Sequence, residues 1–373
     1  MSLFGSICLL LSYYYCRHCK NSQKPWDERL GLTSQGLTIG ARQVISQAGA
    51  ITSFGHASDQ TLRTMCGIKL SESTVRRTTE QVGEEVAEHL AQGETLGPQV
   101  EPWQWQRDAS GKTCAYLSLD HTGIRQQSPG GGRADGRMAA VGMIYNVNSP
   151  HDDRKVEDHQ VRYLSGFYEL DDLGRQLRRE AHAVGIEQAD QQIVLSDGGS
   201  GLEDMMRRWF PKAVCILDFW HAKEHLVELA QELFPSDEAG RKAWTDQWCH
   251  NLKHQGGQAI LAQLQKLSGE SNLSDSARES IRKQIVYFTN NVHRMDYPQY
   301  VARGWQIGSG PVESACKAVI GNRLKGGGMR WSKNGSHAIC ALRALYLSEP
   351  ICWQAFWNVL ASILECRIIY LLS

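Results

Sequence analysis

The sequence has 373 residues, which is long enough for two or three domains with a sizeable apolar core. It is 42% hydrophobic, and its 40 Lys and Arg balance 40 Asp and Glu, so the formal net charge is zero. This is the composition of an ordinary soluble protein, and the neutral total excludes a histone-like use of the whole chain to hold nucleic acid. The 11 cysteines are an odd number without a repeating frame, which favours reduced thiols and a cytoplasmic location.

Residues 1–36 hold one pattern with metal-ligand spacing, the CxxC pair Cys16 and Cys19. Such a pair is half of a four-ligand zinc site, and no second pair follows nearby. We interpret this stretch as a partial zinc-binding-like segment, with Zn²⁺ at Cys16 and Cys19 as a hypothesis. The apolar stretches near the two ends lack the features of a signal peptide or a membrane span, so we expect no membrane contact.

Residues 37–90 have the pattern of three short helices, with glycine breaks between them and a serine before the last. Short helices of this kind, with arginines on the third, favour a helix-turn-helix-like DNA-binding domain in which Arg76 and Arg77 contact DNA. The alternative is a plain helical bundle with both arginines on a solvated face. The three expected helices are 41–49, 54–67 and 71–83.

Beyond a polar linker, residues 91–112, the apolar period changes from that of helices to that of strands. The expected order is βββαβαβα, which predicts an α/β fold with a mixed sheet, whose first part is residues 113–235. The expected strands are 114–120, 139–147, 160–168, 191–197 and 213–218, and the helices are 173–185, 201–209 and one that opens at 219.

Residues 236–300 then show only helical periodicity, which predicts a helical insertion. The core resumes in residues 301–350, where a Gly-Pro break precedes a helix with Glu313 in its first turn. Between residues 301 and 345 there are seven Lys or Arg and a single acid, Glu313. Capping of the helix is one role for this Glu, and a cation site facing a polyanion is the other. Residues 351–373 form a C-terminal tail, which we interpret as a packed helix.

Two of the expected strands end in an aspartate, Asp120 and Asp197, and a glycine-containing turn follows each. Functional groups gather at strand ends in α/β sheets, so these carboxylates can converge on one point, although either one alone is also an ordinary turn residue. Together with Glu313 they make three carboxylates. Hard oxygen ligands, few per site, are what Mg²⁺ uses when substrate phosphates and water complete its shell.

The element order and several segments resemble a known enzyme family. An Asp on the first strand, an Asp ending the fourth and a Glu on a late helix beyond a helical insertion resemble the RNase H-like core of DDE transposases. From about Tyr13 to Ser348 the chain is similar to ISKra-type insertion-sequence transposases, relatives of the Mutator-like group. One departure is His121, where the family more often has Gly. The similar segments are "SLDHTGIRQQ", "GRMAAVGMIYN", "VLSDGG", "RMDYPQYVARGWQIGSGPVESACK" and "NRLKGGGMRW".

The resemblance implies a DNA transposase, a polynucleotidyl transferase that cleaves and joins DNA at insertion-sequence ends. It implies that Asp120, Asp197 and Glu313 are catalytic and hold two Mg²⁺ ions, for which Mn²⁺ can substitute, with Asp120 bridging both metals. It also implies a homo-oligomer that acts on terminal inverted repeats and target DNA in the nucleoid of a prokaryotic cytoplasm. The alternative is an inactive or truncated relative that binds DNA without turnover.

Basic residues surround the Glu313 helix and predict a DNA-binding surface. Lysines and arginines around a glycine triplet can follow a phosphate backbone, and a Trp among them can stack on an exposed base. The alternative for this run is a solvated basic turn. The residues expected to contact DNA here are Lys317, Arg323, Lys325, Arg330, Trp331 and Lys333.

The segment "DFWHAKEH" carries two overlapping patterns. By the resemblance, Asp218 and His221 match the family's C/DxxH element and support the site; by helix-start chemistry alone, Asp218 is an N-cap and His221 a core residue. The same segment contains HxxEH, the inverted zinc-protease signature, in which His221 and His225 bind zinc and Glu224 is the base. Matches of five residues arise by chance and no third ligand is evident, so a zinc metalloprotease is the remote alternative.

Overall fold

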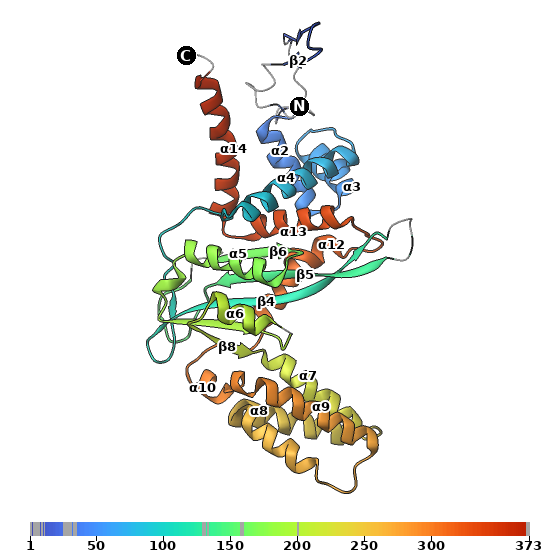
Figure 1. The fold of residues 1–373 in the computed structure, drawn as a ribbon, viewed down its shortest axis with the longest axis vertical. Helices are drawn as coiled ribbons and strands as arrows, with labels where there is room; N and C mark the ends of the chain where they lie inside the picture. Colours follow the sequence, from blue (N-terminus) through green and yellow to red (C-terminus); the bar gives the residue numbers. More distant parts are fainter. Residues whose placement is uncertain are drawn as a thin grey trace.

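A mixed sheet forms the centre of the molecule (Figure 1). The computed structural model describes the chain except residues 1, 3–7, 9, 11, 25–31, 33–35, 129–131, 133, 157–159, 200 and 371–373, and the side chains of 361–370. Within this described part the sheet has six strands in the order β6-β5-β4-β7-β8, with the short β3 paired to β4. The strands β4, β7 and β8 are parallel to one another, and the other pairs are antiparallel. The strands are β3 (Gln106–Arg107), β4 (Thr113–Gln126), β5 (Asp135–Tyr145), β6 (Val161–Gly166), β7 (Gln191–Ser196) and β8 (Ala213–Leu217).

The inner strands are apolar runs whose two faces are both covered. In β4 the six residues from 114 to 119 are all buried, and in β7 every residue after the first is buried. Such continuous runs suit the middle of a sheet that has helices on both faces. The crossover helices that make the parallel pairs are α5 (Leu170–Ala183), with the 3₁₀ turn η3 (Ile186–Gln188), and α6 (Leu202–Trp209), and α7 (Phe219–Leu233) follows β8.

A layer of helices lies beside β6, in the upper part of Figure 1. In this layer α13 packs on β6, and α4 packs on α13. The two helices approach closely at Gly83 of α4, where a Cβ would lie 2.2 Å from the carbonyl oxygen of Ala338. The helices of this layer are α2 (Ile39–Ile51), α3 (Phe54–His56), the π-helix η1 (Ala57–Met65), α4 (Glu72–Gln92), α13 (Lys333–Leu347) and α14 (Pro350–Tyr370).

A second group of helices occupies the opposite end of the molecule, in the lower part of Figure 1, where α8 and α9 pack on α7. The long helix α8 is broken at Gly256, whose φ of 81° only glycine adopts without strain. The chain then returns to the sheet, and α11 packs against β4 and β5. The elements of this second group are α8 (Glu238–Leu267), α9 (Asp275–Asn291), η4 (Val292–Arg294) and α10 (Tyr297–Ala302). Those that follow at the sheet are α11 (Gly310–Ala315), η5 (Cys316–Gly321) and α12 (Asn322–Leu324).

The order βββαβαβα, the helical insertion and the helix in the C-terminal tail are confirmed. The third N-terminal helix is longer than predicted, because α4 continues through Gly83 to residue 92. The CxxC pair lies between two short strands, β1 (Tyr14–Tyr15) and β2 (Ser22–Gln23), which form a separate two-stranded sheet. Among the described helices, none combines the length and the apolar character needed to span a membrane.

Candidate functional site

Three neighbouring parallel strands carry an aspartate just beyond the point where their mutual pairing stops, and the register places these aspartates in one row. Asp197 and Asp218 follow the last residues of β7 and β8, whereas Asp120 lies inside β4, which continues to Gln126 and does not end at Asp120 as expected. The last residues paired between β4 and β7 are Leu119 and Ser196, so Asp120 and Asp197 follow them directly. The last pair between β7 and β8 is Ser196 with Leu217, and Asp218 comes next. Because neighbouring strands lie about 4.8 Å apart, the three backbones are adjacent at the same edge of the sheet.

Burial and a neighbouring charge perturb the carboxyl of Asp120. Its burial raises the pKa of the carboxyl above the usual range, and the charge of Asp197 adds to this rise. Two donors oppose it: the backbone N–H of His121, 2.6 Å from Oδ1, and the thiol of Cys316, 3.4 Å from Oδ2. Burial also raises the pKa of the Cys316 thiol, so this group remains a neutral donor. A carboxylate that burial and a like charge disfavour is a site where a cation would gain binding energy.

Asp197 is held by the turn that follows β7 and by the helical insertion. Its Oδ1 accepts a hydrogen bond of 2.9 Å from the N–H of Gly199. The guanidinium of Arg294, which is 2% exposed, donates to the Ser196 hydroxyl (2.7 Å) and to the carbonyl of Asp197 (3.3 Å). The ring of Tyr287 on α9 lies so near that a Cβ on Gly198 would be 3.1 Å from it. The insertion therefore supports the strand end that carries Asp197.

Glu313 is connected to the row of aspartates through one serine. Its Oε1 lies 2.7 Å from the hydroxyl of Ser309, which also lies 2.8 Å from Oδ2 of Asp218. Asp218 caps α7, as helix-start chemistry predicts, and accepts from the N–H groups of Trp220 and His221 and from that of Ser309. Because Cys316 follows Glu313 by about one helical turn and contacts Asp120, the Glu313 helix is seated on the same sheet edge.

The donor set agrees in chemistry with a hard divalent cation. Asp120, Asp197 and Glu313 offer only carboxylate oxygens, which Mg²⁺ prefers, and two of them are close enough for one charge to affect the pKa of the other. Within the described residues, no group of three or more His, Cys, Asp or Glu side chains has a metal-binding arrangement. The three carboxylates are instead paired with donors of the protein, namely the His121 N–H, the Gly199 N–H and the Ser309 hydroxyl.

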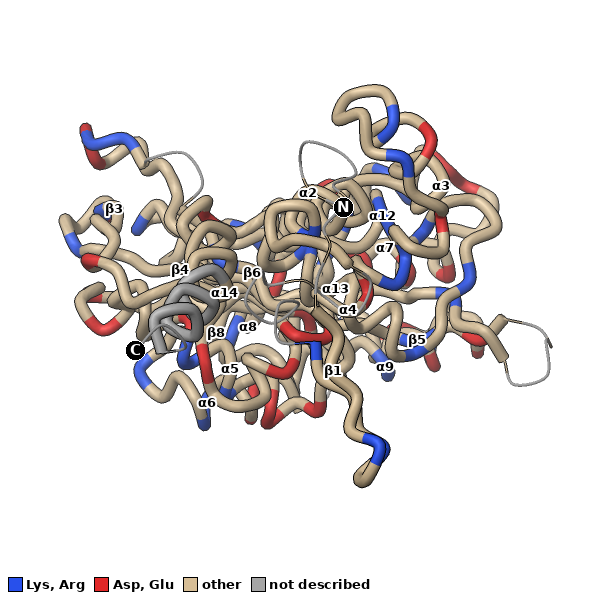
Figure 2. Tube along the Cα trace, turned by 90° about the horizontal axis from the view of Figure 1, so that it is seen from above, with Lys and Arg blue, Asp and Glu red and all other residues tan. Residues whose placement is uncertain are grey.

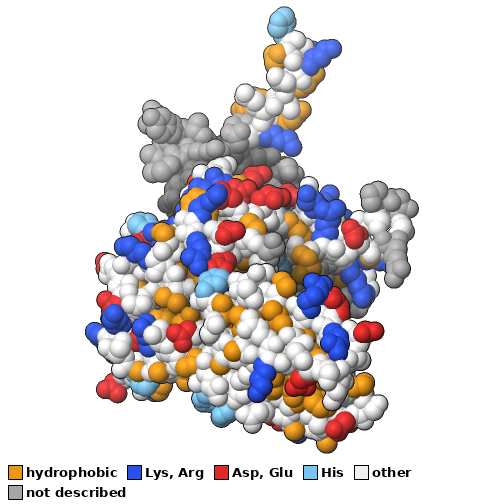
Figure 3. Space-filling view, turned by 60° about the horizontal axis from the view of Figure 1, so that its bottom comes forward, with side chains coloured by type: hydrophobic (Ala, Val, Ile, Leu, Met, Phe, Trp, Pro, Cys, Tyr) orange, Lys and Arg blue, Asp and Glu red, His pale blue; other side chains and the backbone are white. Residues whose placement is uncertain are grey.

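Most of the basic residues expected to contact DNA are exposed. Lys325 donates a hydrogen bond to the hydroxyl of Thr122, two residues beyond Asp120 on β4, so one cation of the glycine-rich run lies next to the acids. Two exposed arginines on the β4–β5 hairpin, Arg125 and Arg137, were not predicted and extend the basic surface. Figure 2 shows Lys and Arg next to β5, and in Figure 3 Lys and Arg side chains lie on both sides of the face shown, with acidic side chains among them. The expected residues that are exposed are Arg76, Arg77, Lys317, Lys325, Arg330 and Lys333.

Arg323 and Trp331 are buried, which corrects the expectation that they contact DNA. Their exposed fractions are 2% and 6%. The guanidinium of Arg323 lies 4.4 Å from the ring of Phe54 and 5.1 Å from that of Trp331, and its Nε donates to the carbonyl of Gly49. The Trp331 indole donates to the carbonyl of Leu324. Both residues therefore join the glycine-rich loop to the N-terminal helices.

The CxxC cysteines lie near each other at the surface. Hydrogen bonds from Cys19, backbone and side chain, lower the pKa of the Cys16 thiol, which favours the thiolate that zinc would bind. His18 also contributes a backbone hydrogen bond to Cys16. In the described residues no third ligand completes a site with them. Zinc at this pair stays a prediction.

The HxxEH residues of α7 are engaged by their neighbours. The ring of His225 stacks on Tyr287 with centroids 3.6 Å apart, and burial lowers the pKa of this His. His221 lies 3.5 Å from the carboxylate of Glu224, and its ring is perpendicular to that of His225 at 5.5 Å. A third zinc ligand is not present among the side chains that the structure describes. The arrangement therefore gives the metalloprotease alternative no support.

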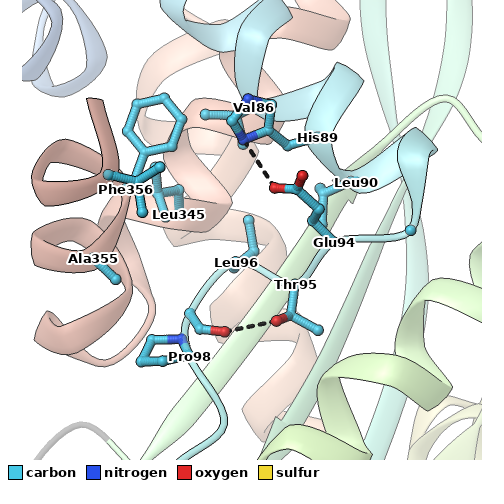
Figure 4. A pocket seen from close by; sticks show the side chains of 13 residues that line it. Val86, His89, Leu90, Glu94, Thr95, Leu96, Pro98, Leu345, Ala355 and Phe356 are labelled. Carbon is cyan, nitrogen blue, oxygen red and sulfur yellow. Dashed lines mark hydrogen bonds and ion pairs between the residues drawn. The ribbon is translucent and has the colours of Figure 1, made fainter. Parts of the chain in front are cut away.

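A pocket of about 380 Å³ lies elsewhere, between α4, α14 and the loop after α4 (Figure 4). Its wall is mainly apolar, with Val86, Leu90 and Phe356 facing the cavity. The titratable pair at its rim, His89 and Glu94, is joined at 3.3 Å. Since α4 and α14 belong to the upper layer in Figure 1, this pocket is separate from the strand ends that carry the acids.

Sequence reasoning missed the residues that support the acids. Ser309, Arg294 and Cys316 lie within a segment that resembles the family, but no role was predicted for their side chains. One signal was available: "LSLD", "VLSD" and "CILD" are three apolar strand segments, each followed by an aspartate at the same place in the register. No protein-family model matches the chain, and a search of curated proteins finds no match. The function of this site must therefore be argued from its residues and their arrangement.

Proposed function

We propose that this protein is a DDE transposase with an RNase H-like core, which uses Mg²⁺ to cleave DNA and to join a DNA 3′ end to a target. The observation that carries the proposal is the adjacency of Asp120 and Asp197 where the pairing of β4 and β7 stops, together with the contact of Cys316, one helical turn after Glu313, with Asp120. The sheet order, with the first catalytic strand β4 in the middle and an antiparallel β5–β6 pair on one side, supports an RNase H-like core.

The chemistry of the neighbourhood fits a phosphodiester substrate. Bound Mg²⁺ would supply activation of the attacking hydroxyl and stabilisation of charge on the phosphate, and Asp120, Asp197 and Glu313 would hold it. Lys325 contributes a cation that can neutralise a phosphate oxygen beside Asp120. Ser309 fixes the orientation of the Glu313 carboxylate, and Arg294 fixes the backbone of Asp197. The exposed arginines of the hairpin and of α4 continue the basic surface along which DNA would lie.

The test is a cleavage assay with the full chain and duplex DNA that contains the sequences flanking its coding region. We expect strand cleavage that requires Mg²⁺ or Mn²⁺ and stops on addition of EDTA. We expect Asp197→Asn and Glu313→Gln to lower the rate by more than about 100-fold, the upper end of what loss of an outer-shell partner costs. Glu224→Gln is the matched control, because this exposed glutamate belongs to the HxxEH pattern and not to the acids of the site.

Full activity of either acid variant would reject the proposal. Salt-dependent DNA binding by the wild type, without metal-dependent cleavage under any of these conditions, would decide for the inactive DNA-binding relative. Loss of activity in Glu224→Gln, with both acid variants active, would point to the HxxEH residues instead.

A further inference from the structure

Trp220 is an exposed tryptophan at the start of α7, next to the acids. Its exposed fraction is 51%, and among the large hydrophobic side chains that the structure describes as exposed, it is the one tryptophan. A single exposed apolar side chain is not in itself a sign of a ligand. The position of this indole beside the acids, and the contacts that hold it, make it a candidate binding surface.

The surroundings of Trp220 hold its ring in one place. The indole lies against the loop before α11, where a Cβ on Gly308 would be only 2.9 Å from the indole nitrogen. Lys223, one helical turn further along α7, places its ammonium 4.9 Å from the ring centroid. Phe219, which is buried, meets the same ring edge to face at 5.9 Å. The indole is thus held in one place, and the ammonium of Lys223 lies over one of its faces.

This ring belongs to the same local network as the acids. The backbone N–H of Trp220 donates to Asp218, which also accepts from Ser309. Gly308, against which the indole lies, directly precedes Ser309, and Ser309 contacts Glu313. The stacking surface is therefore fixed to the loop and helix that carry one of the three carboxylates. A ligand on the ring would lie beside a phosphate held at that carboxylate.

We propose that Trp220 and Lys223 form a stacking site for an unpaired nucleobase of the DNA strand whose phosphate lies at the acids. The inference rests on the proposed function, and it states that the substrate DNA has an unpaired base at Trp220. Every base has a π-face that an indole can stack on, but paired bases inside a duplex have both faces covered, so the site selects an unpaired base. The ammonium of Lys223 is then placed for the adjoining phosphate. The buried Trp331 cannot serve this purpose.

The test measures binding of the full chain, in EDTA and without turnover, to a fluorescein-labelled 20-nucleotide oligothymidine and to a blunt duplex of the same length. We expect Trp220→Ala to weaken binding to the single strand by about 5- to 100-fold, the range for loss of one stacked base. We expect Trp220→Phe to retain most of the affinity, because a smaller ring still stacks. Affinity for the blunt duplex should change by less than about twofold.

Trp353→Ala is the matched control, since this half-buried tryptophan lies on α14 and packs edge to face on Tyr346. It should bind the single strand like the wild type, and urea unfolding checks that every variant is folded. Unchanged single-strand affinity in Trp220→Ala, an equal loss in Trp220→Phe, or an equal loss for the duplex would each overturn the inference. Trp220-dependent binding in a protein that never cleaves DNA would support the stacking site and refute the proposed activity.

Discussion

Ser309→Ala isolates the hydrogen bond that orients Glu313. The serine hydroxyl lies 2.7 Å from Glu313 and 2.8 Å from Asp218, and Ser309 is 7% exposed. Asp218 keeps three backbone N–H donors after the substitution, at 3.1, 3.1 and 2.9 Å. Among the described residues, Ser309 is the hydrogen-bond partner found for the Glu313 carboxylate. The substitution should therefore affect Glu313 much more than the folding of the chain.

The two effects differ in size. Loss of the hydroxyl costs about 1 kcal/mol of folding free energy, because Asp218 keeps its backbone donors and the exposed Glu313 carboxylate can accept from water. A hydrogen bond to a charged group is worth about 1.5 to 3 kcal/mol, and loss of a partner that orients a metal ligand costs about 10- to 100-fold in metal affinity. We expect the Mg²⁺ concentration for half-maximal effect to rise by about 10- to 100-fold, with cleavage recovering at high Mg²⁺.

Two assays measure the binding of Mg²⁺. One follows the rise of the thermal unfolding midpoint with Mg²⁺ concentration, which does not depend on DNA, and the other follows cleavage. Ser314→Ala is the matched control, because Ser314 is exposed and directly follows Glu313 in α11. An unchanged Mg²⁺ midpoint in Ser309→Ala, or an equal shift in Ser314→Ala, would refute the reasoning from the hydrogen bond.

Gly83→Ala should lower the free energy of unfolding in urea by about 1 to 3 kcal/mol, because the new methyl group meets the backbone of Ala338; a gain of about 1 kcal/mol, usual for this change inside a helix, would contradict the packing of α4 on α13. Lys325→Ala should weaken binding to duplex DNA at every sequence and reduce the slope of log affinity against log salt by about 0.9, measured by titration at several salt concentrations; an unchanged slope would exclude a phosphate contact. Burial raises the pKa of Glu180, beside Arg162, to about 7 from a usual 4.5, so the folded state binds this proton more tightly than the unfolded chain. Protonated Glu180 therefore contributes up to about 3 kcal/mol to the free energy of unfolding below about pH 4.5. This contribution is lost as the pH rises to about 7. Urea unfolding from pH 4.5 to 8 should therefore show a weaker decline in Glu180→Gln than in the wild type, and parallel curves would contradict this assignment.

The strands and crossover helices were predictable because each is an apolar run of the right period with polar or glycine borders. Residues 114–119 and 191–196 are examples. The extension of β4 to Gln126 was not predictable in the same way, since residues beyond Asp120 are partly exposed and pair with β5 in a projecting hairpin. The helix α4 was predicted to end at Gly83, but it continues to residue 92. Gly83 allows α13 to pack closely on α4, and this contact cannot be read from the sequence around the glycine.

The candidate site was predictable where local sequence determines it and not where packing does. Asp120 and Asp197 follow apolar strands, so their place at the sheet edge comes from the strands themselves. Arg323 and Trp331 belong to a run that is basic and rich in glycine, which indicates a surface. They are buried because Phe54, more than 260 residues earlier, packs against both of their side chains. No pattern in the sequence around these two residues predicts their contact with Phe54.

The environments of the three aspartates assign them different roles. Asp218 is 5% exposed and accepts from three backbone N–H groups, so its charge is compensated and it acts as an anchor for the loop before Glu313. Asp120 occupies the same row but lacks that compensation, and both burial and Asp197 disfavour its charge. A fold gains no stability from a carboxylate in the environment of Asp120, whereas a site that binds cations can use it. The contrast between Asp218 and Asp120, on strands of one sheet, is therefore the physical argument for placing the chemistry at Asp120 and Asp197.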